Sequence, residues 1–494
     1  MEEFIVTAVN WALDIWRRLP WHWLVFIFHS VLAPLSAFHA MMYKRDSRAA
    51  LGWVAVCLFF PLAGPTTYYL FGINRIQTEA KRLLAHKLFS LQIGYERGKV
   101  TKSQVHSELV LDTPLLRFSR VGERLTSNPL TSGNKVQLLQ NGEQTYPAMI
   151  SAINAAKQSV YLTTYIFETD STGRELIDAL GEAKTRGVDV RVILDGFGEL
   201  YSFPRARHLL RKRGINVGRF LPPKLLPPTL YVNLRNHRKI LVVDGVYGFT
   251  GGMNLGGRHM VKAGGKNCTA DIHFSVSGPV VRQLQSNFVS DWKFITGEEL
   301  PVPEDTHNKE AGQCYCRCIN DGPNEDLDQI SLAIKTAIAT ALHSVVIMTP
   351  YFLPSREMIA VLQSAALRGV EITVILPEKS NLRFVDWATR NLLWELLQYD
   401  IQVLLQPPPF AHSKLLIVDG YYAQIGSANQ DPRSLRLNFE LNMEVIGEEL
   451  LEQLRPYVDS IFQASRQITL AEVDNRLLVA RIRDAFFWLF LPYL

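Results

Sequence analysis

The sequence predicts an α/β protein built from two copies of one unit and preceded by a hairpin of two apolar helices. Three observations predict this fold class. Strand and helix patterns alternate through most of the 494 residues. The stretch NHRKILVVDG at 236–245 is repeated as AHSKLLIVDG at 411–420, and the second histidine lies 175 positions after the first. Two long apolar runs lie near the start of the chain.

Composition fits a folded protein with a sizeable core. Hydrophobic residues make up 47% and charged residues 20%, and the length allows two or more domains. The net charge of +5 fits contact with phosphate-rich material, either anionic lipid or nucleic acid, and does not choose between them.

The first 76 residues predict a membrane-attached region. Residues 1–20 place apolar side chains at helical spacing, which predicts an amphipathic helix on a membrane surface. The runs at about 21–43 and 49–71 are long enough to cross a hydrocarbon core of roughly 30 Å, so residues 21–76 are predicted to form a transmembrane hairpin. Buried core helices or a cleaved signal peptide fit less well, because aromatic residues mark the ends and a second run follows at once.

The rest of the chain divides into a connecting segment, two α/β units and a linker. We expect the connection at 77–128, the first unit at 129–297, the linker at 298–313 and the second unit at 314–494. Strand, helix and strand patterns at 159–167, 172–187 and 188–196 match those at 344–353, 355–369 and 370–378. The matching order predicts a duplication whose sheets are buried on both faces.

Two further features complete the chain. The three cysteines of QCYCRCIN are spaced by two, which places Cys314, Cys316 and Cys318 on one face of a strand. We expect reduced, partly buried structural residues, with a metal or redox role as the alternative. The apolar tail at 485–494 either dips into a bilayer or caps the core, and the sequence leaves both open.

The repeated motif divides its three ionisable residues between two faces. A histidine and a lysine two residues apart share one face of a strand, whereas the aspartate has the opposite parity and precedes a glycine in the exit turn. We therefore assign histidine and lysine to chemistry and aspartate to support. The motif residues are His237, Lys239 and Asp244 in the first copy and His412, Lys414 and Asp419 in the second.

Two such copies brought face to face would place two imidazoles and two ammonium groups around one point. Two fixed positive charges suit a phosphoryl group. One imidazole can attack phosphorus, while the other protonates the leaving alcohol and deprotonates the incoming one. We predict no metal and no cofactor, because the sequence shows no evident carboxylate cluster for Mg²⁺.

Polar residues downstream of each motif are candidates for support. Asn254 and Asn429 each fall 17 residues after their histidine, among small residues that permit close backbone approach. Their amides could donate to a phosphate oxygen, or they could form a plain turn before a helix. Asp271 and Glu440, one in each copy, are available to hold the second nitrogen of that copy's histidine.

The duplicated HxKxxxxD motif with its trailing GGxN and GSAN segments resembles the phospholipase D superfamily. The apolar hairpin, TPYFLPS at 349–355 and GSANQDPRSLRLNFELN at 426–442 are similar to bacterial cardiolipin synthases, and the resemblance covers essentially the whole chain. It implies two phospholipase D-like α/β sandwich domains related by pseudo-two-fold symmetry. It also implies transfer of a phosphatidyl group between two phosphatidylglycerol molecules, through a phosphatidyl-histidine, to give cardiolipin and glycerol.

The resemblance also implies roles and partners. His237 is expected as nucleophile and His412 as acid and base, although the two could be exchanged, and Asp271 and Glu440 are expected to buttress the histidines. Expected partners are phosphatidylglycerol, other anionic phospholipids and the bilayer, without nucleic acid. The expected location is the bacterial inner membrane, multi-pass, and an excess of basic residues beside the large domain favours its cytoplasmic placement.

One segment departs from the family pattern. LGGRHMVKAGGKNCTADIH carries Arg258, Lys262 and Lys266 where acidic and aromatic residues are usual, which favours a more anionic substrate.

Three alternatives use the same scaffold. The first is a membrane-anchored phosphodiesterase or nuclease. The apolar stretch at 220–232 disfavours it, because nucleic-acid grooves interleave basic and aromatic residues. The second is a phosphatidylserine synthase or phospholipase D with a different acceptor. The third is a non-catalytic scaffold, which two intact motifs argue against.

Overall fold

The computed structural model describes residues 21–44, 47–72, 114–222, 234–264, 268–301, 310–322 and 328–490. The chain forms two compact units, residues 1–82 and 83–494. The predicted amphipathic helix at 1–20 and most of the predicted connecting segment lie outside the described residues.

The N-terminal unit is a helical hairpin whose second arm is broken. Its elements are α2 (Trp21–Tyr43), α3 (Ser47–Phe59), α4 (Ala63–Thr67) and the π-helical turn η1 (Tyr68–Gly72). The prediction of one helix at 49–71 is wrong, because Pro61 cannot continue α3 and Leu62 takes a positive φ of 56°. Among the described residues, no helix combines enough length with enough apolar character to cross a bilayer.

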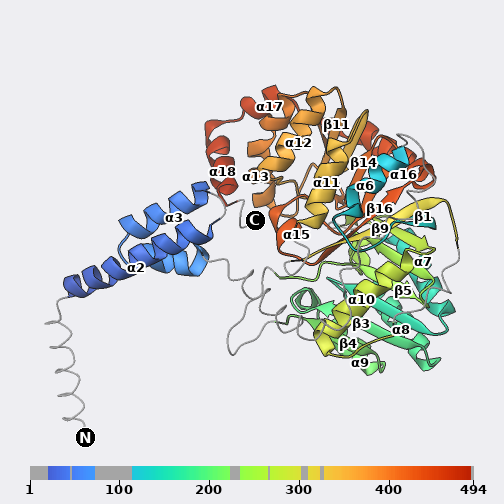
Figure 1. Ribbon diagram of the computed structural model, residues 1–494. Coiled ribbons are helices and arrows are strands. Elements are labelled where there is room, and N and C mark those ends of the chain that lie inside the picture. The colour runs from blue at the N-terminus through green and yellow to red at the C-terminus, as the bar shows by residue number, and fades with distance from the viewer. Residues whose placement is uncertain are drawn as a thin grey trace, which may run out of the picture. The chain divides into compact units, whose positions relative to one another are not determined.

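The large unit is organised around one 15-stranded sheet (Figure 1). In spatial order, the first half contributes β4 (Asn216–Phe220), β3 (Asp189–Asp195), β2 (Ser159–Thr164), β5 (Ile240–Val243), β6 (Tyr247–Gly251), β8 (Ile272–Ser277) and β1 (Thr131–Gln140). The second half continues with β9 (Cys314–Asp321), β16 (Glu440–Ile446), β15 (Tyr422–Gly426), β14 (Leu415–Val418), β10 (Ser344–Met348), β11 (Glu371–Pro377), β12 (Gln402–Gln406) and β17 (Arg466–Gln467).

The two halves meet where β1 runs antiparallel to β9, with Thr131 opposite Cys316 and Asn134 opposite Cys314. Outward from this join, each half repeats the same strand order. In both halves the motif strand lies antiparallel to the first strand of a parallel trio: β5 pairs with β2, and β14 pairs with β10. The predicted duplication of an α/β unit is therefore confirmed.

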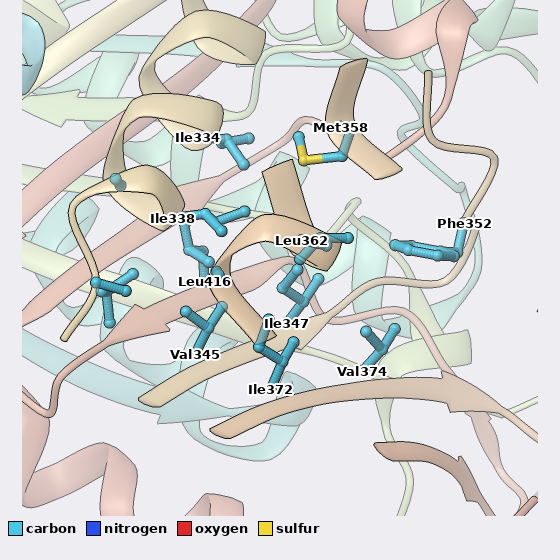
Figure 2. Packing of buried hydrophobic residues seen from close by; sticks show 14 of the residues in the cluster. Ile334, Ile338, Val345, Ile347, Phe352, Met358, Leu362, Ile372, Val374 and Leu416 are labelled. Carbon is cyan, nitrogen blue, oxygen red and sulfur yellow. The ribbon is translucent and has the colours of Figure 1, made fainter. Parts of the chain in front are cut away.

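Helices cover both faces of the sheet. One face carries α10 (Val281–Thr296) and α16 (Glu448–Ala464), which pack on strands of both halves. The opposite face carries α7 (Asn141–Ala155), α8 (Ser171–Thr185) and α9 (Ala206–Lys212) in the first half, and α6 (Pro114–Glu123), α11 (Gln329–Ala339) and α12 (Arg356–Leu367) in the second. Figure 2 shows Ile338 of α11 and Leu362 of α12 packed on Val345, Ile347 and Ile372 of the strands.

The sheet is buried on both faces, as predicted. Along β14, Leu416 and Val418 join the core under α11 and α12, whereas Leu415 and Ile417 join the core under α16. Cys314, Cys316 and Cys318 lie on one face of β9, as predicted, and they are fully buried where the sequence predicted partial burial. Burial raises the pKa of the Cys314 thiol to about 11.

The remaining elements are short or C-terminal. They are η3 (Gly198–Tyr201), η4 (Gly257–His259), β7 (Thr269–Ala270), β13 (Phe410–Ala411), α13 (Arg383–Leu392), α14 (Trp394–Leu397), α15 (Pro432–Arg436), α17 (Leu470–Asp474) and α18 (Leu478–Trp488). Two of them, β7 and β13, form a separate two-stranded sheet that links the two halves.

Candidate active site

The two motif histidines lie just before β5 and β14, in extended segments that pair with the opposite half. The backbone N–H of His237 donates to the carbonyl oxygen of Phe439 at 2.9 Å, beside a bridge between Asn236 and Phe439. In the same way, the N–H of His412 donates to the carbonyl oxygen of Ala270 at 2.7 Å, at the end of the β7–β13 pair. Each histidine is thus held against the residue that precedes the other half's carboxylate.

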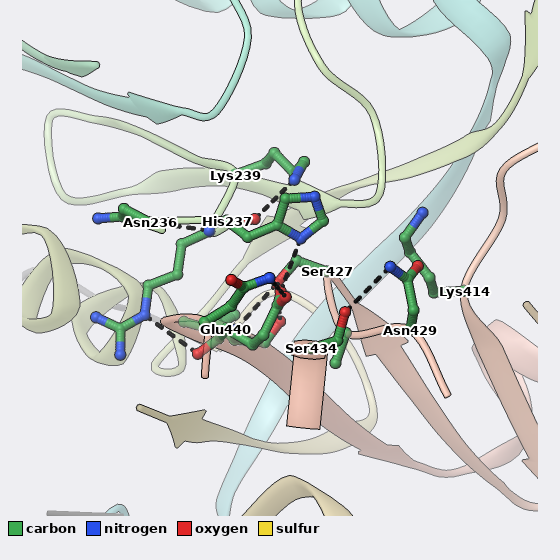
Figure 3. A network of polar contacts seen from close by, with 12 residues as sticks. Asn236, His237, Lys239, Lys414, Ser427, Asn429, Ser434 and Glu440 are labelled. Atoms are coloured by element: carbon green, nitrogen blue, oxygen red, sulfur yellow. Dashed lines mark hydrogen bonds and ion pairs between the residues drawn. The ribbon is translucent and has the colours of Figure 1, made fainter. Parts of the chain in front are cut away.

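The histidine–carboxylate pairs are therefore crossed between the halves. His237 Nδ1 lies 3.0 Å from Glu440 Oε2 (Figure 3), and His412 Nδ1 lies 2.7 Å from Asp271 Oδ2. The prediction that each carboxylate serves its own copy's histidine is wrong, because backbone pairing brings each histidine to the far half. A carboxylate at Nδ1 fixes the tautomer that leaves Nε2 for chemistry.

The carboxylates of Asp271 and Glu440 are fully buried, and each makes more than one hydrogen bond. Ser427 Oγ donates to Glu440 Oε2, and Asn438 Nδ2 donates to Glu440 Oε1 at 3.2 Å. Burial acts to raise the pKa of Glu440, but His237 and Lys239 together hold that pKa below its usual value. Glu440 is therefore the charged partner of its pair.

Gly252 allows the first half to approach Asp271 and Lys414 closely. A Cβ atom at this position would lie 2.8 Å from Asp271 Oδ1 and 3.1 Å from Lys414 Cδ. The small residue after the first motif thus leaves space for the carboxylate that holds His412.

The two lysines flank the imidazoles and are almost fully buried. Lys239 Nζ donates to the carbonyl oxygen of His237 at 2.7 Å, and Lys414 Nζ lies 3.0 Å from both ring nitrogens of His412. Burial lowers the pKa of Lys239 to about 7 and that of Lys414 to about 8. The two ammonium groups therefore titrate close to neutral pH.

The surroundings of both histidines favour the neutral form of the ring. Burial lowers the pKa of His237 to about 4, with Glu440 opposing this effect and Lys239 and Lys414 adding to it. Burial also lowers the pKa of His412 well below its usual value, and Lys414, Lys239 and His237 contribute in the same direction. These mutual effects show that the two motifs share one electrostatic environment.

The two motif aspartates lie away from this cluster, at the exits of β5 and β14. The Asp244 carboxylate accepts the backbone N–H groups of Lys157, Gln158 and Ser159 at 2.7–2.8 Å. The Asp419 carboxylate accepts those of Leu342, His343 and Ser344 and also pairs with Arg117. Both residues have positive φ, 51° and 53°, which short polar side chains tolerate better than most.

The two asparagines are buried in local loop contacts. Asn254 Oδ1 accepts the N–H of Ile166 at 3.2 Å, and Asn429 Nδ2 donates to Ser434 Oγ at 3.1 Å. Their predicted contact with phosphate stays a prediction.

Two residues that shape the site, Arg238 and Tyr165, were not predicted from the sequence. Arg238, between the motif histidine and lysine, donates to Asp291 at 2.8 Å and to the carbonyl oxygen of Glu440 at 3.1 Å. The ring of Tyr165 stands edge-on to His237, with centroids 5.3 Å apart, and lies under Lys239 Nζ. Tyr165 follows β2, and its position at the carboxyl end of a strand is the one signal that could have indicated it.

No group of three or more histidine, cysteine, aspartate or glutamate side chains is placed to hold a metal ion within the described ranges.

A duplicated α/β sandwich that contributes one His-x-Lys pair from each half defines the phospholipase D-like class of protein. The family model described as "Cardiolipin synthase, PLD-like domain" matches residues 149–292 and 334–462, which is more than half of the chain. A second model, "Phospholipase_D-nuclease N-terminal", matches residues 31–72. The chain belongs to the phospholipase D-like cardiolipin synthase family.

Relatives match along nearly the whole length. The chain is 30% identical to the major cardiolipin synthase ClsA of Bacillus subtilis (strain 168), over 95% of this chain and 98% of that protein. It is 32% identical to cardiolipin synthase A of Pseudomonas syringae pv. syringae (strain B728a), over 90% and 92%. The crystal structure of a phosphatidylserine synthase from Haemophilus influenzae Rd KW20 superposes with a TM-score of 0.60 at 16% identity, covering 76% of this chain and all of that one, and shows the fold alone.

Proposed function

We propose that this protein is a cardiolipin synthase that transfers a phosphatidyl group from one phosphatidylglycerol to another and releases glycerol. The observation that carries the proposal is the crossed pair of histidine–carboxylate contacts, flanked by two buried lysines. The names of the relatives, which match along nearly their whole length, support the choice of product. The donor is the lipid that the family resemblance implies.

In the first step, His237 Nε2 attacks the phosphorus of a phosphatidylglycerol. The new P–N bond forms as the P–O bond to the glycerol headgroup breaks, and His412 gives its proton to the departing glycerol oxygen. Lys239 and Lys414 neutralise the non-bridging oxygens as charge develops on them. Glu440 stabilises the positive charge that forms on the His237 ring.

In the second step, the terminal hydroxyl of another phosphatidylglycerol gives its proton to His412. The hydroxyl oxygen attacks phosphorus, the P–N bond breaks, and cardiolipin leaves with His237 restored. His412 is protonated again, so the cycle closes without any other reactant.

The bound lipid itself prepares His412 as an acid. Burial and the two lysines lower the pKa of His412 and so favour its neutral form. A phosphate placed between the lysines offsets their charge, which raises the pKa of His412 toward the value that proton donation needs. An anionic substrate thus activates the acid that cleaves it.

Arg258 supports an anionic acceptor. It lies in η4, which precedes β7, and its side chain is 38% exposed and paired with Glu168. Burial and the charges nearer to the ring have the larger effects on the pKa of His412, and Arg258 lowers this pKa further. The positive charge of Arg258 therefore acts on the site. In this proposal Arg258 contacts the second, non-reacting phosphate of the acceptor lipid.

The N-terminal unit attaches the enzyme to the cytoplasmic membrane, with the large unit on the cytoplasmic side. Support comes from the family match at 31–72 and from large apolar side chains that are more than half exposed, namely Phe26, Phe28, Leu35, Phe38 and Met41. Labelling of a cysteine placed at Lys44 from outside the cell tests the multi-pass arrangement. Modification there supports a hairpin that crosses the bilayer, and protection contradicts it.

The reaction is tested with purified enzyme and phosphatidylglycerol labelled in its headgroup glycerol. We expect one glycerol released for each cardiolipin formed, and an acid-labile phosphatidyl adduct on His237 in quenched samples. Phosphatidic acid as the main product would instead assign a phospholipase D. Label release that requires added phosphatidylethanolamine or serine would assign a different donor or acceptor.

A further inference from the structure

The C-terminal helix α18 leaves an apolar stripe uncovered. Five large apolar side chains of this region are each more than half exposed: Leu478 69%, Val479 78%, Ile482 60%, Phe486 54% and Leu489 66%. Leu478, Ile482, Phe486 and Leu489 follow one another at spacings of four, four and three residues, and Val479 lies beside Leu478, so all five fall within about 100° on one side of the helix and its C-cap. We call these five residues the α18 stripe.

The opposite face of α18 is fixed firmly to the large unit. Asp484 is fully buried and pairs with Arg476 and Arg483. The ring of Phe487 packs on Trp387 of α13, with centroids 4.9 Å apart. The helix therefore cannot rotate its stripe into the core without leaving a buried carboxylate unpaired.

Cations border the stripe on both edges. Counted at 100° per residue, Arg481 falls on one side of the five apolar residues and Arg483 on the other. Arg481 is exposed, and the guanidinium of Arg483 lies over Trp387 at 4.6 Å. Residues 475–490 contain three arginines and one acidic residue, and that acidic residue is the buried Asp484.

We propose that the α18 stripe lies in the interface of an anionic membrane, so that the large unit has its own contact with the bilayer. An apolar face bordered by arginines suits this partner, because acyl chains cover the apolar side chains while the exposed Arg481 reaches a lipid phosphate. Arg483 stays paired with Asp484 and adds positive charge at the other edge. The contact goes beyond the proposed function, which attaches only the N-terminal unit. It would keep the two histidines close to the lipids on which they act.

The position of the stripe is measured with a fluorescent label in the full-length enzyme. Ile482→Cys, in a Cys268→Ser background because the other four cysteines are buried, carries an environment-sensitive dye. The matched control is Leu367→Cys on α12, an apolar side chain of the same half that is 74% exposed. The enzyme is reconstituted into phosphatidylglycerol-containing vesicles, with and without brominated acyl chains.

We expect bromine to quench the dye at 482 and to leave the dye at 367 unchanged. Vesicles in which all phosphatidylglycerol is replaced by phosphatidylcholine should reduce the quenching at 482. Equal quenching at the two positions, or none at 482, would overturn the proposal. So would cross-linking of 482 to a second copy of the chain or to the N-terminal unit in place of lipid contact.

A charged variant gives a second readout. Ile482→Asp with Phe486→Asp should lower cardiolipin formation in vesicles by about fivefold or more, while turnover of short-chain phosphatidylglycerol in solution stays the same. Leu367→Asp should change neither. Equal activity of the double variant and the parent in vesicles would reject the contact. Absence of cardiolipin formation by the parent enzyme both in vesicles and with the short-chain lipid would reject the proposed reaction and leave the quenching result standing.

Discussion

At the scale of single residues, the crossed contacts make a sharp prediction about which side chains act together. Glu440 holds His237, and Asp271 holds His412, although each carboxylate belongs to the other half. Variants of a carboxylate should therefore reproduce the defect of the histidine in the opposite motif. Pairing within a half would give the reverse pattern.

A donor lipid with a p-nitrophenol headgroup separates the two pairs, because this leaving group needs no general acid. We expect Asp271→Asn, like His412→Ala, to keep the initial burst of p-nitrophenol and to lose cardiolipin formation. Glu440→Gln, like His237→Ala, should slow the burst by about 100-fold. The measurement is stopped-flow absorbance in the first turnover.

As a control, each of the four variants should associate with membranes and melt at the same temperature as the parent enzyme. A burst that survives Glu440→Gln and disappears in Asp271→Asn would contradict the crossed assignment if His237 is the nucleophile. The same burst pattern together with a burst in His237→Ala would only exchange the roles of the two histidines.

The two buried lysines predict the pH dependence. Burial lowers the pKa of Lys239 to about 7 and that of Lys414 to about 8. Because a neutral amine cannot neutralise a phosphate, kcat/KM should fall as pH rises through 7–8. Lys239→Arg keeps its charge and should move the lower step to higher pH.

The free energy of unfolding should rise over the pH range in which kcat/KM falls. A buried lysine with a lowered pKa binds fewer protons in the folded state than in the unfolded state, so the free energy of unfolding rises between about pH 7 and 10. Activity that falls over this range without loss of melting temperature identifies a catalytic titration. A melting temperature that falls in parallel would contradict this account.

At the scale of elements, the motif aspartates belong to strand ends. Asp244 binds three consecutive N–H groups at the start of β2, and Asp419 does the same for β10. Asp244→Ala should lower the free energy of unfolding by about 2–3 kcal/mol, because it leaves these donors unpaired and puts alanine at positive φ. Chemical denaturation of the solubilised enzyme measures the change.

Asp244→Asn is the matched control, since asparagine tolerates positive φ and keeps one acceptor oxygen. It should cost less than half as much. Residual kcat per folded molecule should stay near the parent value in both variants. A loss of kcat as large as that of His237→Ala would place Asp244 in the chemistry.

The limits of prediction from sequence are clearest at the same scale. The parity of a strand placed Asp244 in the exit turn, because side chains alternate along any strand, and the structure has it there. The partner of each histidine could not be predicted in this way. It depends on the pairing of Asn236 with Phe439 and of Ala411 with Ala270, contacts between segments far apart in the chain. Leu62 and Pro61 similarly break a helix that hydropathy alone describes as continuous.

At the scale of the whole molecule, the duplication explains how the two halves together form the candidate active site. β1 and β9 join the halves into a single sheet, and the buried core under α10 and α16 spans both. A repeat of strand and helix patterns was enough to predict two equivalent units. It did not predict the antiparallel join, because equivalent strands carry no sequence signal for pairing with each other.

This architecture makes the site dependent on both halves of one chain. A mixture of the His237→Ala and His412→Ala enzymes should show no turnover, because exchanging halves would require separation of β1 from β9 and of β7 from β13. Fragments divided within residues 302–309 of the predicted linker should each be inactive alone. Co-expressed, they should recover cardiolipin formation, because each supplies one histidine and the carboxylate for the other. Turnover by either fragment alone would show that one half suffices, and turnover by the mixed variants would show that halves exchange between chains.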